Sequence, residues 1–298
     1  MNTATWPGTV SERNRATLPL PFISLQVAPS PTSSPSAAAC AHTRPSSRRV
    51  LVTSRCGRRA EAIGHKIITV PSLDGKVTPE SISNALANNA HYPHMAKPRL
   101  VYVSNATEMG TLYTKAELSA ISDLCKQRGL LLYLDGARLG AALSAPKNDL
   151  TLPDLVQLTD IFWIGGTKVG MLLGEAIIIS NPLLAEDFSF HVKQRGGLLA
   201  KGRTLGVQFL EMFSTNLFFD LAQHTNEMAQ LLSSRIQDAG YKLAAETETN
   251  QVFAILPNSL LSTLQEQFQF YIWEKMDDEH TMVRLVLLKK DISKPEPR

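Results

Sequence analysis

Short apolar runs alternate with amphipathic stretches through the middle of the chain, from about residue 61 to residue 205. Apolar or β-branched runs that end at turn residues predict strands at residues 66–70, 100–103, 130–134, 161–164 and 175–179. Apolar residues at helical spacing, with capping residues at the ends, predict helices over about 78–89 and 115–128. Strands that alternate with helices favour an α/β fold with a mostly parallel sheet and helices on both faces.

The pattern changes beyond about residue 206. Two helical stretches, 207–219 and 221–239, are followed by apolar runs that predict strands at 251–256, 269–273 and 282–286. We therefore expect a large α/β domain over residues 61–205 and a smaller C-terminal α+β domain over residues 206–298.

Residues 1–60 have a different composition. Pro, Ser, Thr, Ala and Arg dominate, and the segment holds eight Arg, no Lys and one acid, Glu12. Its formal charge is therefore +7, and subtracting this from the total of +3 leaves −4 for the rest of the chain. Because such a segment buries too little apolar surface to offset its ordering entropy, we expect it to be disordered or aberrant. An organellar targeting arm is the alternative, which the many prolines disfavour because it needs an amphipathic helix.

Composition excludes several classes of protein and site. The mildly acidic remainder of the chain predicts no nucleic-acid partner. Three widely spaced cysteines, Cys40, Cys56 and Cys125, predict neither a zinc site nor a disulfide framework, and favour a reducing compartment such as the cytoplasm. No run of 18 or more apolar residues occurs, so we expect no transmembrane helix and no membrane partner.

Two residues at predicted strand ends suggest cofactor chemistry. Asp135 follows the strand at 130–134, and Lys168 follows the strand at 161–164 after Gly165 and Gly166. Ligands bind at the carboxyl ends of strands in open α/β sheets, where an acid and a lysine could serve pyridoxal 5′-phosphate (PLP). The lysine would form a Schiff base and the acid would keep the ring nitrogen protonated. Taken singly, each residue has a structural explanation, a turn or helix cap for Asp135 and a solvent-exposed lysine for Lys168.

Three motifs resemble those of threonine aldolases and the similar phenylserine aldolases. They are residues 103–114 (Val-Ser-Asn-Ala-Thr-Glu-Met-Gly-Thr-Leu-Tyr-Thr), 134–139 (Leu-Asp-Gly-Ala-Arg-Leu) and 165–170 (Gly-Gly-Thr-Lys-Val-Gly). The resemblance extends from about Glu61 to Val286. It implies the β-eliminating lyase group of PLP-dependent enzymes of fold type I, and usually a homo-oligomer, a dimer or tetramer.

The resemblance also implies roles for individual residues. Lys168 matches the Schiff-base lysine and Asp135 the partner of the pyridine nitrogen. Arg138 matches an arginine near the cofactor that helps to hold the substrate carboxylate. Arg284, within the strand at 282–286, matches the small-domain arginine that binds the same carboxylate, and an arginine in an apolar strand independently indicates an anionic partner.

Weaker candidates surround this set. Thr167, and Arg203 from a neighbouring subunit, are candidates for the cofactor phosphate, with a surface ion pair as the alternative for Arg203. Asn105 and Thr107 either line the edge of the cofactor or form a turn. These assignments predict cleavage of the Cα–Cβ bond of a β-hydroxy-α-amino acid, such as threonine or phenylserine, to glycine and an aldehyde.

The front of the chain departs from the family pattern. The phosphate loop and the ring-stacking histidine, which family members carry before the equivalent of Glu61, are not recognisable here. His42 is not assigned to stacking, His65, His91 and His94 are expected at the surface or in loops, and no general base is assigned. A reading-frame shift or mispredicted exon would explain residues 1–60. The alternatives for function are therefore a PLP-dependent β-eliminating lyase acting on another amino acid, or a truncated, inactive relative.

Overall fold

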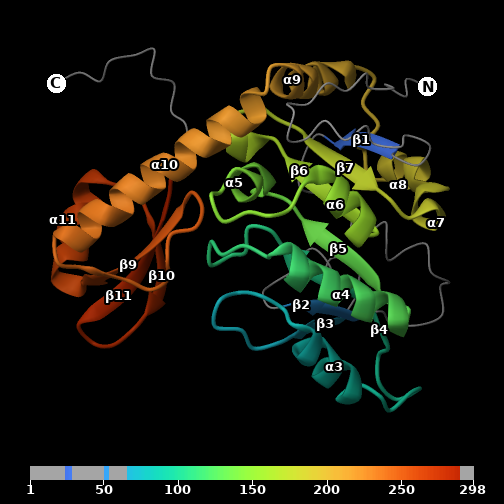
Figure 1. The fold of residues 1–298 in the computed structure, drawn as a ribbon, viewed down its shortest axis with the longest axis horizontal. Helices are drawn as coiled ribbons and strands as arrows, with labels where there is room; N and C mark the ends of the chain where they lie inside the picture. Colours follow the sequence, from blue (N-terminus) through green and yellow to red (C-terminus); the bar gives the residue numbers. More distant parts are fainter. Residues whose placement is uncertain (1–23, 29–49, 54–65, 289–298) are drawn as a thin grey trace.

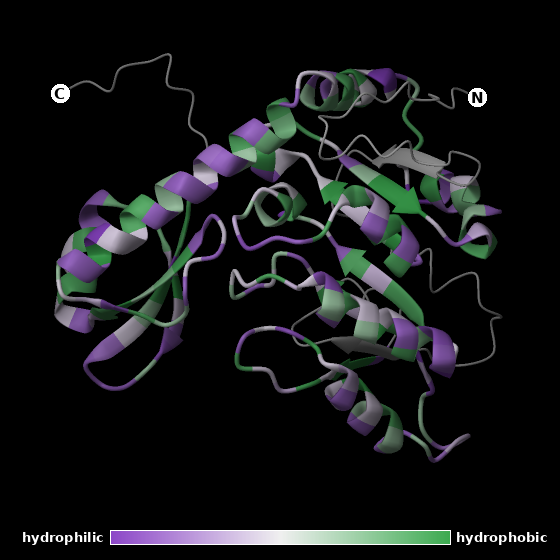
Figure 2. Cartoon of the chain, in the orientation of Figure 1, coloured by the Kyte–Doolittle hydropathy of each residue, from purple (hydrophilic) through white to green (hydrophobic). Residues whose placement is uncertain are grey.

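A computed structural model describes residues 24–28, 50–53 and 66–288 of the chain. These residues form two lobes, each built around its own sheet (Figure 1). Apolar residues concentrate in the sheets and on the inward faces of the helices, as the hydropathy colouring shows (Figure 2). In this described part of the chain, no helix is long and apolar enough to cross a membrane.

The large lobe contains a seven-stranded sheet in the order β1-β7-β6-β5-β4-β2-β3. Its strands are β1 (Ser24–Ala28), β2 (Val50–Thr53), β3 (Lys66–Thr69), β4 (Pro98–Ser104), β5 (Leu131–Asp135), β6 (Ile161–Gly165) and β7 (Glu175–Ile179). β3, β2, β4, β5 and β6 run parallel, and β7 runs antiparallel to both of its neighbours. The prediction of a mostly parallel sheet is confirmed.

Two strands lie within the segment that we expected to be disordered. β1 and β2 are its two runs rich in apolar and β-branched residues, 24–28 and 50–53, and such runs favour extended backbone. β2 pairs with β3 and β4, and β1 pairs with β7. The prediction that residues 1–60 are disordered or aberrant stays a prediction, and His42 and His65 lie outside the described residues.

Alternating side chains of the central strands build a core on each face of the sheet. One core joins Leu132 and Leu134 to helices on the first face, namely α3 (Pro79–Ala87), α4 (Lys115–Arg128), α6 (Leu152–Leu158) and α9 (Arg203–Ser214). The other joins Tyr133 to the short helices α7 (Pro182–Ala185) and α8 (Phe188–Gln194). Helices on both faces explain why these strands are apolar at successive positions.

Local capping chemistry fixes α4, whose predicted limits are confirmed. Thr114 accepts a hydrogen bond from the Glu117 backbone nitrogen, and the Glu117 carboxylate accepts one from the Thr114 backbone nitrogen. At the other end Gly129 adopts a left-handed conformation with φ of 62°. Cys125 lies buried on this helix, and burial raises the pKa of its thiol to about 12.

The small lobe contains an antiparallel sheet in the order β10-β11-β9-β8, with helices on one face. Its elements are α10 (Leu217–Asp238), β8 (Lys242–Leu243), β9 (Gln251–Pro257), α11 (Asn258–Gln267), β10 (Tyr271–Lys275) and β11 (His280–Val286). A left-handed residue, Asn216, separates α10 from α9. α9 places Phe209, Met212 and Phe213 in the core of the large lobe. The domain boundary at 205/206 stays a prediction.

Candidate active site

The strand ends that carry Asp135 and Lys168 lie side by side. β5 and β6 are parallel neighbours, so their carboxyl ends meet at the same edge of the sheet. Beyond the paired residues, the Gly165 backbone nitrogen donates to the Gly136 carbonyl oxygen at 3.0 Å. This hydrogen bond continues the contact between the two strands past the end of β5. The sequence therefore brings an acid and a lysine to one place, as the strand pattern predicts.

Two glycines make this close approach possible. A Cβ atom on Gly136 would lie 1.9 Å from the Trp163 carbonyl oxygen, and one on Gly165 would lie 2.6 Å from the Ala137 carbonyl oxygen. Both contacts are with backbone atoms, which cannot move aside as a side chain can. Glycine at these positions is therefore a steric requirement for placing Asp135 next to the segment of Lys168.

Lys168 lies in a single 3₁₀ turn, Thr167–Val169, directly after β6. Helix α10 contacts this turn from the first face of the sheet. Burial, and after it the positive charge of Arg138, lowers the pKa of the Lys168 ammonium below its ordinary value. A lysine in these surroundings is more often neutral than an exposed one, and a neutral amine is a nucleophile.

Arg138 is a buried cation in the same site. It immediately precedes α5 (Leu139–Leu143), and only 8% of its surface is exposed. Burial lowers the pKa of its guanidinium, the charge of Glu108 opposes this effect and that of Arg284 adds to it. Its Nε atom is buried and has no hydrogen-bond partner within the described residues. An unpartnered buried donor on a cation indicates a place for an anionic ligand.

Arg284 reaches the site from β11 of the small lobe. Its Cζ atom lies 4.7 Å from the centre of the Trp273 ring and 5.3 Å from that of Tyr271, both on β10. Its Nη1 atom lies 3.5 Å from Glu108 Oε2, while its Nε, like that of Arg138, is buried without a partner in the part of the chain that the structure describes. Aromatic rings thus hold the guanidinium and leave donors available.

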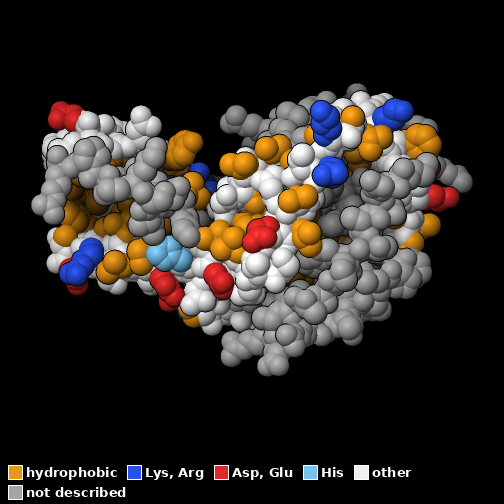
Figure 3. Space-filling model, turned by 90° about the horizontal axis from the view of Figure 1, so that it is seen from above, with side chains coloured by type: hydrophobic (Ala, Val, Ile, Leu, Met, Phe, Trp, Pro, Cys, Tyr) orange, Lys and Arg blue, Asp and Glu red, His pale blue; other side chains and the backbone are white. Residues whose placement is uncertain are grey.

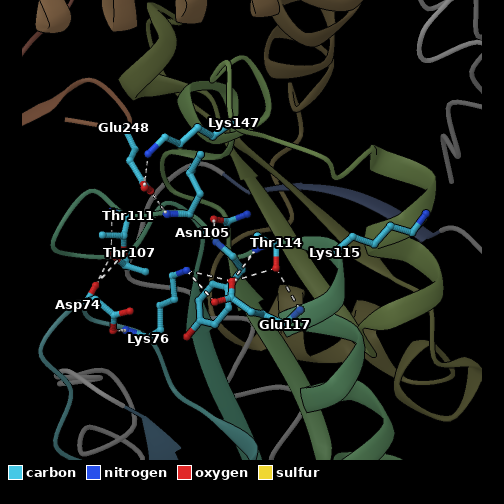
Figure 4. A network of polar contacts seen from close by, with 12 residues as sticks. Asp74, Lys76, Asn105, Thr107, Thr111, Thr114, Lys115, Glu117, Lys147 and Glu248 are labelled. Carbon is cyan, nitrogen blue, oxygen red and sulfur yellow. Dashed lines mark hydrogen bonds and ion pairs between the residues drawn. The ribbon is translucent and has the colours of Figure 1, made fainter. Parts of the chain in front are cut away.

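The loop that joins β4 to α4 forms one wall of the site. Thr107 Oγ1 accepts hydrogen bonds from the backbone nitrogens of Met109 and Thr111, both at 3.2 Å, which supports the turn interpretation for Thr107. Figure 4 shows Thr107 beside Thr111 in this loop. Asn105 is fully buried, and its Oδ1 accepts from the Tyr113 backbone nitrogen at 3.3 Å. Its Nδ2 has no partner among the described residues. It is therefore a third unpartnered donor in the site, beside the Nε atoms of Arg138 and Arg284.

The small lobe is fastened to the tip of this loop. Gln251 Nε2 donates to the Thr107 carbonyl oxygen at 3.1 Å, and Thr249 Oγ1 donates to the Gly110 carbonyl oxygen at 2.9 Å. Glu248 Oε2 accepts from the Leu112 backbone nitrogen at 2.8 Å (Figure 4). These bonds set the position of the sheet that carries Arg284 relative to the loop that carries Glu108.

The charged residues of the site fit a PLP molecule and an amino-acid carboxylate. Two arginine cations, Arg138 and Arg284, and the amine of Lys168 lie beside two carboxylates, those of Asp135 and Glu108. The unpartnered donors within the described residues of this site are on the two arginines and on a buried amide. An anionic ligand that brings hydrogen-bond acceptors would satisfy these donors.

The weaker candidates for the cofactor phosphate, Thr167 and Arg203, are both exposed. Thr167 is exposed in the turn of Lys168, and Arg203 is exposed at the first residue of α9. Their roles at a phosphate stay predictions. His91 and His94 are exposed, as expected.

Sequence reasoning missed four residues around the arginines and Asp135, namely Tyr102, Glu108, Tyr271 and Trp273. Tyr102 donates a hydrogen bond to Asp135 Oδ2, and the other three surround Arg284. Strand pairing brings Tyr102 to Asp135 and the β10 aromatic residues to Arg284. The contact of Glu108, which lies in the motif at 103–114, depends on how the two lobes are placed.

Three comparisons agree with this geometry. The sequence model of the Beta-eliminating lyase family matches residues 29–259. A low-specificity L-threonine aldolase of Pseudomonas sp. (strain NCIMB 10558) is 39% identical over 215 residues, which cover 70% of this chain and 60% of that protein. The structure of a Leishmania major threonine aldolase matches with a TM-score of 0.85 at 41% identity, over 90% of this chain and 80% of that one.

A methionine aminotransferase from Escherichia coli, 13% identical with a TM-score of 0.67, shares the fold alone. The chain thus has the α/β architecture of the PLP-dependent enzymes of fold type I. It belongs to the beta-eliminating lyase family. The matched region begins at residue 29, so it includes part of the segment that the motifs alone left unassigned. The chain spans about 60% of the length of the curated relative that it matches.

Proposed function

We propose that this chain carries the site of a PLP-dependent aldehyde-lyase, which cleaves the Cα–Cβ bond of β-hydroxy-α-amino acids to glycine and an aldehyde. The observation that carries the proposal is the meeting of Lys168, Asp135 and Arg138 at one sheet edge, opposite Arg284 of the small lobe. The similarity to threonine aldolases of Pseudomonas and Leishmania supports substrates of the threonine or phenylserine type.

Lys168 would hold the cofactor at its aldehyde carbon, and Asp135 would hold it at its ring nitrogen. The neutral amine of Lys168, favoured by burial and by the charge of Arg138, is suited to attack an aldehyde carbon. The Asp135 carboxylate is suited to accept a hydrogen bond from a protonated ring nitrogen. When bound, PLP supplies a cationic ring that accepts the electron pair released at Cα as the Cα–Cβ bond breaks.

Arg138 and Arg284 would bind the substrate carboxylate between the lobes. Each has an unpartnered Nε, and a planar guanidinium offers paired donors that match a carboxylate. Fixing the carboxylate also fixes the orientation of the Cα substituents, which decides which bond breaks. Glu108, now beside Arg284, would have to yield part of its contact to the substrate.

We further propose that the chain forms homo-oligomers and that Arg203 and Thr167 serve a cofactor phosphate, Arg203 from a neighbouring copy. Large apolar side chains are exposed before and along α9, among them Leu198, Leu199, Val207 and Leu210. In the view from above, exposed apolar side chains lie beside Lys and Arg side chains on the large lobe (Figure 3). Light scattering that gives a monomer mass at micromolar concentration would contradict the oligomer.

Absorbance spectroscopy tests the proposal. The purified chain, mixed with PLP, should show a visible band that Lys168→Ala abolishes and that the matched change of an exposed lysine, Lys201→Ala, leaves in place. Acetaldehyde from threonine or benzaldehyde from phenylserine would then establish the lyase reaction. Ammonia and an oxo acid in place of an aldehyde would indicate elimination instead, and the lack of any Lys168-dependent band would show an inactive relative.

A further inference from the structure

Both carboxylate oxygens of Asp135 are held by hydrogen bonds. The Ala137 backbone nitrogen donates to Oδ1 at 2.9 Å, a local bond that an aspartate at the end of a strand commonly makes. The Tyr102 hydroxyl donates to Oδ2, and this second bond comes from a different strand, β4. Together the two bonds fix the rotation of the carboxylate about its Cβ–Cγ bond.

Strand register delivers the Tyr102 hydroxyl to this place. In the parallel pair of β4 and β5, Tyr102 lies opposite Tyr133, and Ser104 lies opposite Asp135. Because alternate residues share a face, Tyr102, Tyr133 and Asp135 project from the same face of the sheet. The rings of Tyr102 and Tyr133 stack with centres 5.2 Å apart and planes 23° apart, which directs the Tyr102 hydroxyl along the strands toward Asp135.

The surroundings of Tyr102 keep its hydroxyl a donor. Its ring packs against the core that contains Tyr133 and the residues of α7 and α8. Burial, and after it the charge of Asp135, raises the pKa of Tyr102 well above its ordinary value. The phenol therefore stays protonated at every pH at which the protein would work, and Asp135 is the acceptor.

We propose that Tyr102 is a positioning residue, which orients the Asp135 carboxylate toward the ring nitrogen of PLP; this inference rests on the proposed function. Asp135 touches the cofactor in that scheme, whereas Tyr102 acts through Asp135. A carboxylate fixed on two sides by protein donors presents its remaining lone pairs in one direction. Hydrogen bonds to metal-binding histidines orient those side chains in the same way. Without the Tyr102 hydroxyl, the bond from Ala137 is the one that remains to Asp135 among the described residues.

A double-mutant cycle on PLP affinity tests the inference without measuring catalysis. The dissociation constant for PLP is measured by absorbance titration for the original chain, Tyr102→Phe, Asp135→Asn and the double variant. Tyr102→Phe keeps the stacked ring and removes only the hydroxyl. It should weaken PLP binding roughly tenfold when Asp135 is present, the scale of one hydrogen bond to a charged group. In the Asp135→Asn background the same change should have almost no effect.

Tyr113→Phe is the matched control, because it also removes a hydroxyl from a buried tyrosine of the large lobe. That hydroxyl accepts from the Val77 backbone nitrogen at 2.6 Å, away from Asp135. It should reduce stability and leave the PLP affinity unchanged in both backgrounds. Circular dichroism checks that each variant folds.

The outcomes separate the two proposals. An equal loss of affinity from Tyr102→Phe in both backgrounds, or no loss in either, overturns the positioning role and leaves the proposed function standing. If the original chain binds no PLP, the proposed function fails and the role of Tyr102 fails with it. A loss confined to the chain that retains Asp135 supports both.

Discussion

Glu108 and Arg284 face each other across the boundary between the two lobes, with 3.5 Å between Oε2 and Nη1. The arginine side chain is 14% exposed and the glutamate 42%. The glutamate thus occupies one side of a guanidinium that we propose to bind a substrate carboxylate. A protein carboxylate and a substrate carboxylate would then compete for the same donors.

Removing the charge of Glu108 should therefore favour the substrate. We expect Glu108→Gln to tighten the binding of glycine to the PLP-loaded chain a few-fold, with a larger effect at low salt because screening weakens charge competition. Isothermal titration calorimetry at two salt concentrations measures this. Glu266→Gln makes the same charge change on the exposed side of α11 and should have no effect. Weaker glycine binding in Glu108→Gln would mean that Glu108 assists the substrate.

Gly165 should tolerate no side chain. In Gly165→Ala the new Cβ would lie 2.6 Å from the Ala137 carbonyl oxygen, so the strand end must shift. We expect a loss of about 1–3 kcal/mol in the free energy of unfolding, the usual cost of overpacking. Gly206→Ala is the control, since open space surrounds that position within α9, and it should gain up to about 1 kcal/mol. Urea denaturation would contradict the geometry if both variants shifted in the same direction.

Glu248 should contribute more to stability than its neighbour Glu246. Glu248 accepts from the Leu112 backbone nitrogen at 2.8 Å, and its side chain is 18% exposed. Glu248→Ala leaves that donor unpartnered, at a cost of about 1–3 kcal/mol. Glu246 pairs with Lys147 at the surface, and Glu246→Ala should change the unfolding midpoint little. Equal midpoints for the two variants would show that the bond to Leu112 does not hold the lobes.

Lys168 should make the cofactor-free chain less stable near neutral pH. Burial lowers its pKa in the folded chain, so the unfolded chain binds more protons and stability rises with pH. We expect Lys168→Met to raise the melting temperature at neutral pH. This gain should shrink as the pH approaches about 10.4, where the unfolded lysine also loses its proton. Lys201→Met, at an exposed lysine, is the control. A gain independent of pH would point to packing, not to charge.

The sequence predicts the parts of the site that depend on local pattern. Apolar runs place Asp135 and Lys168 at strand ends, and the rules of parallel sheets bring such ends together. The sequence does not predict the contacts of Tyr102 with Asp135 or of Glu108 with Arg284, because these depend on strand register and on the placement of one lobe against the other. The predicted helix over 207–219 also runs through Asn216, where the structure separates α9 from α10. A left-handed asparagine has no reliable sequence signal.

The long helix α10 belongs to both lobes. It contacts α5 and the turn of Lys168 in the large lobe, and β8 and β9 in the small lobe. Asn226 anchors it through a hydrogen bond from Nδ2 to the Ala141 carbonyl oxygen at 2.9 Å. A helix frays only from its ends, so neither lobe can unfold without removing support from the other. The two lobes should therefore melt in one cooperative transition, and amide protons along the middle of α10 should be among the slowest to exchange.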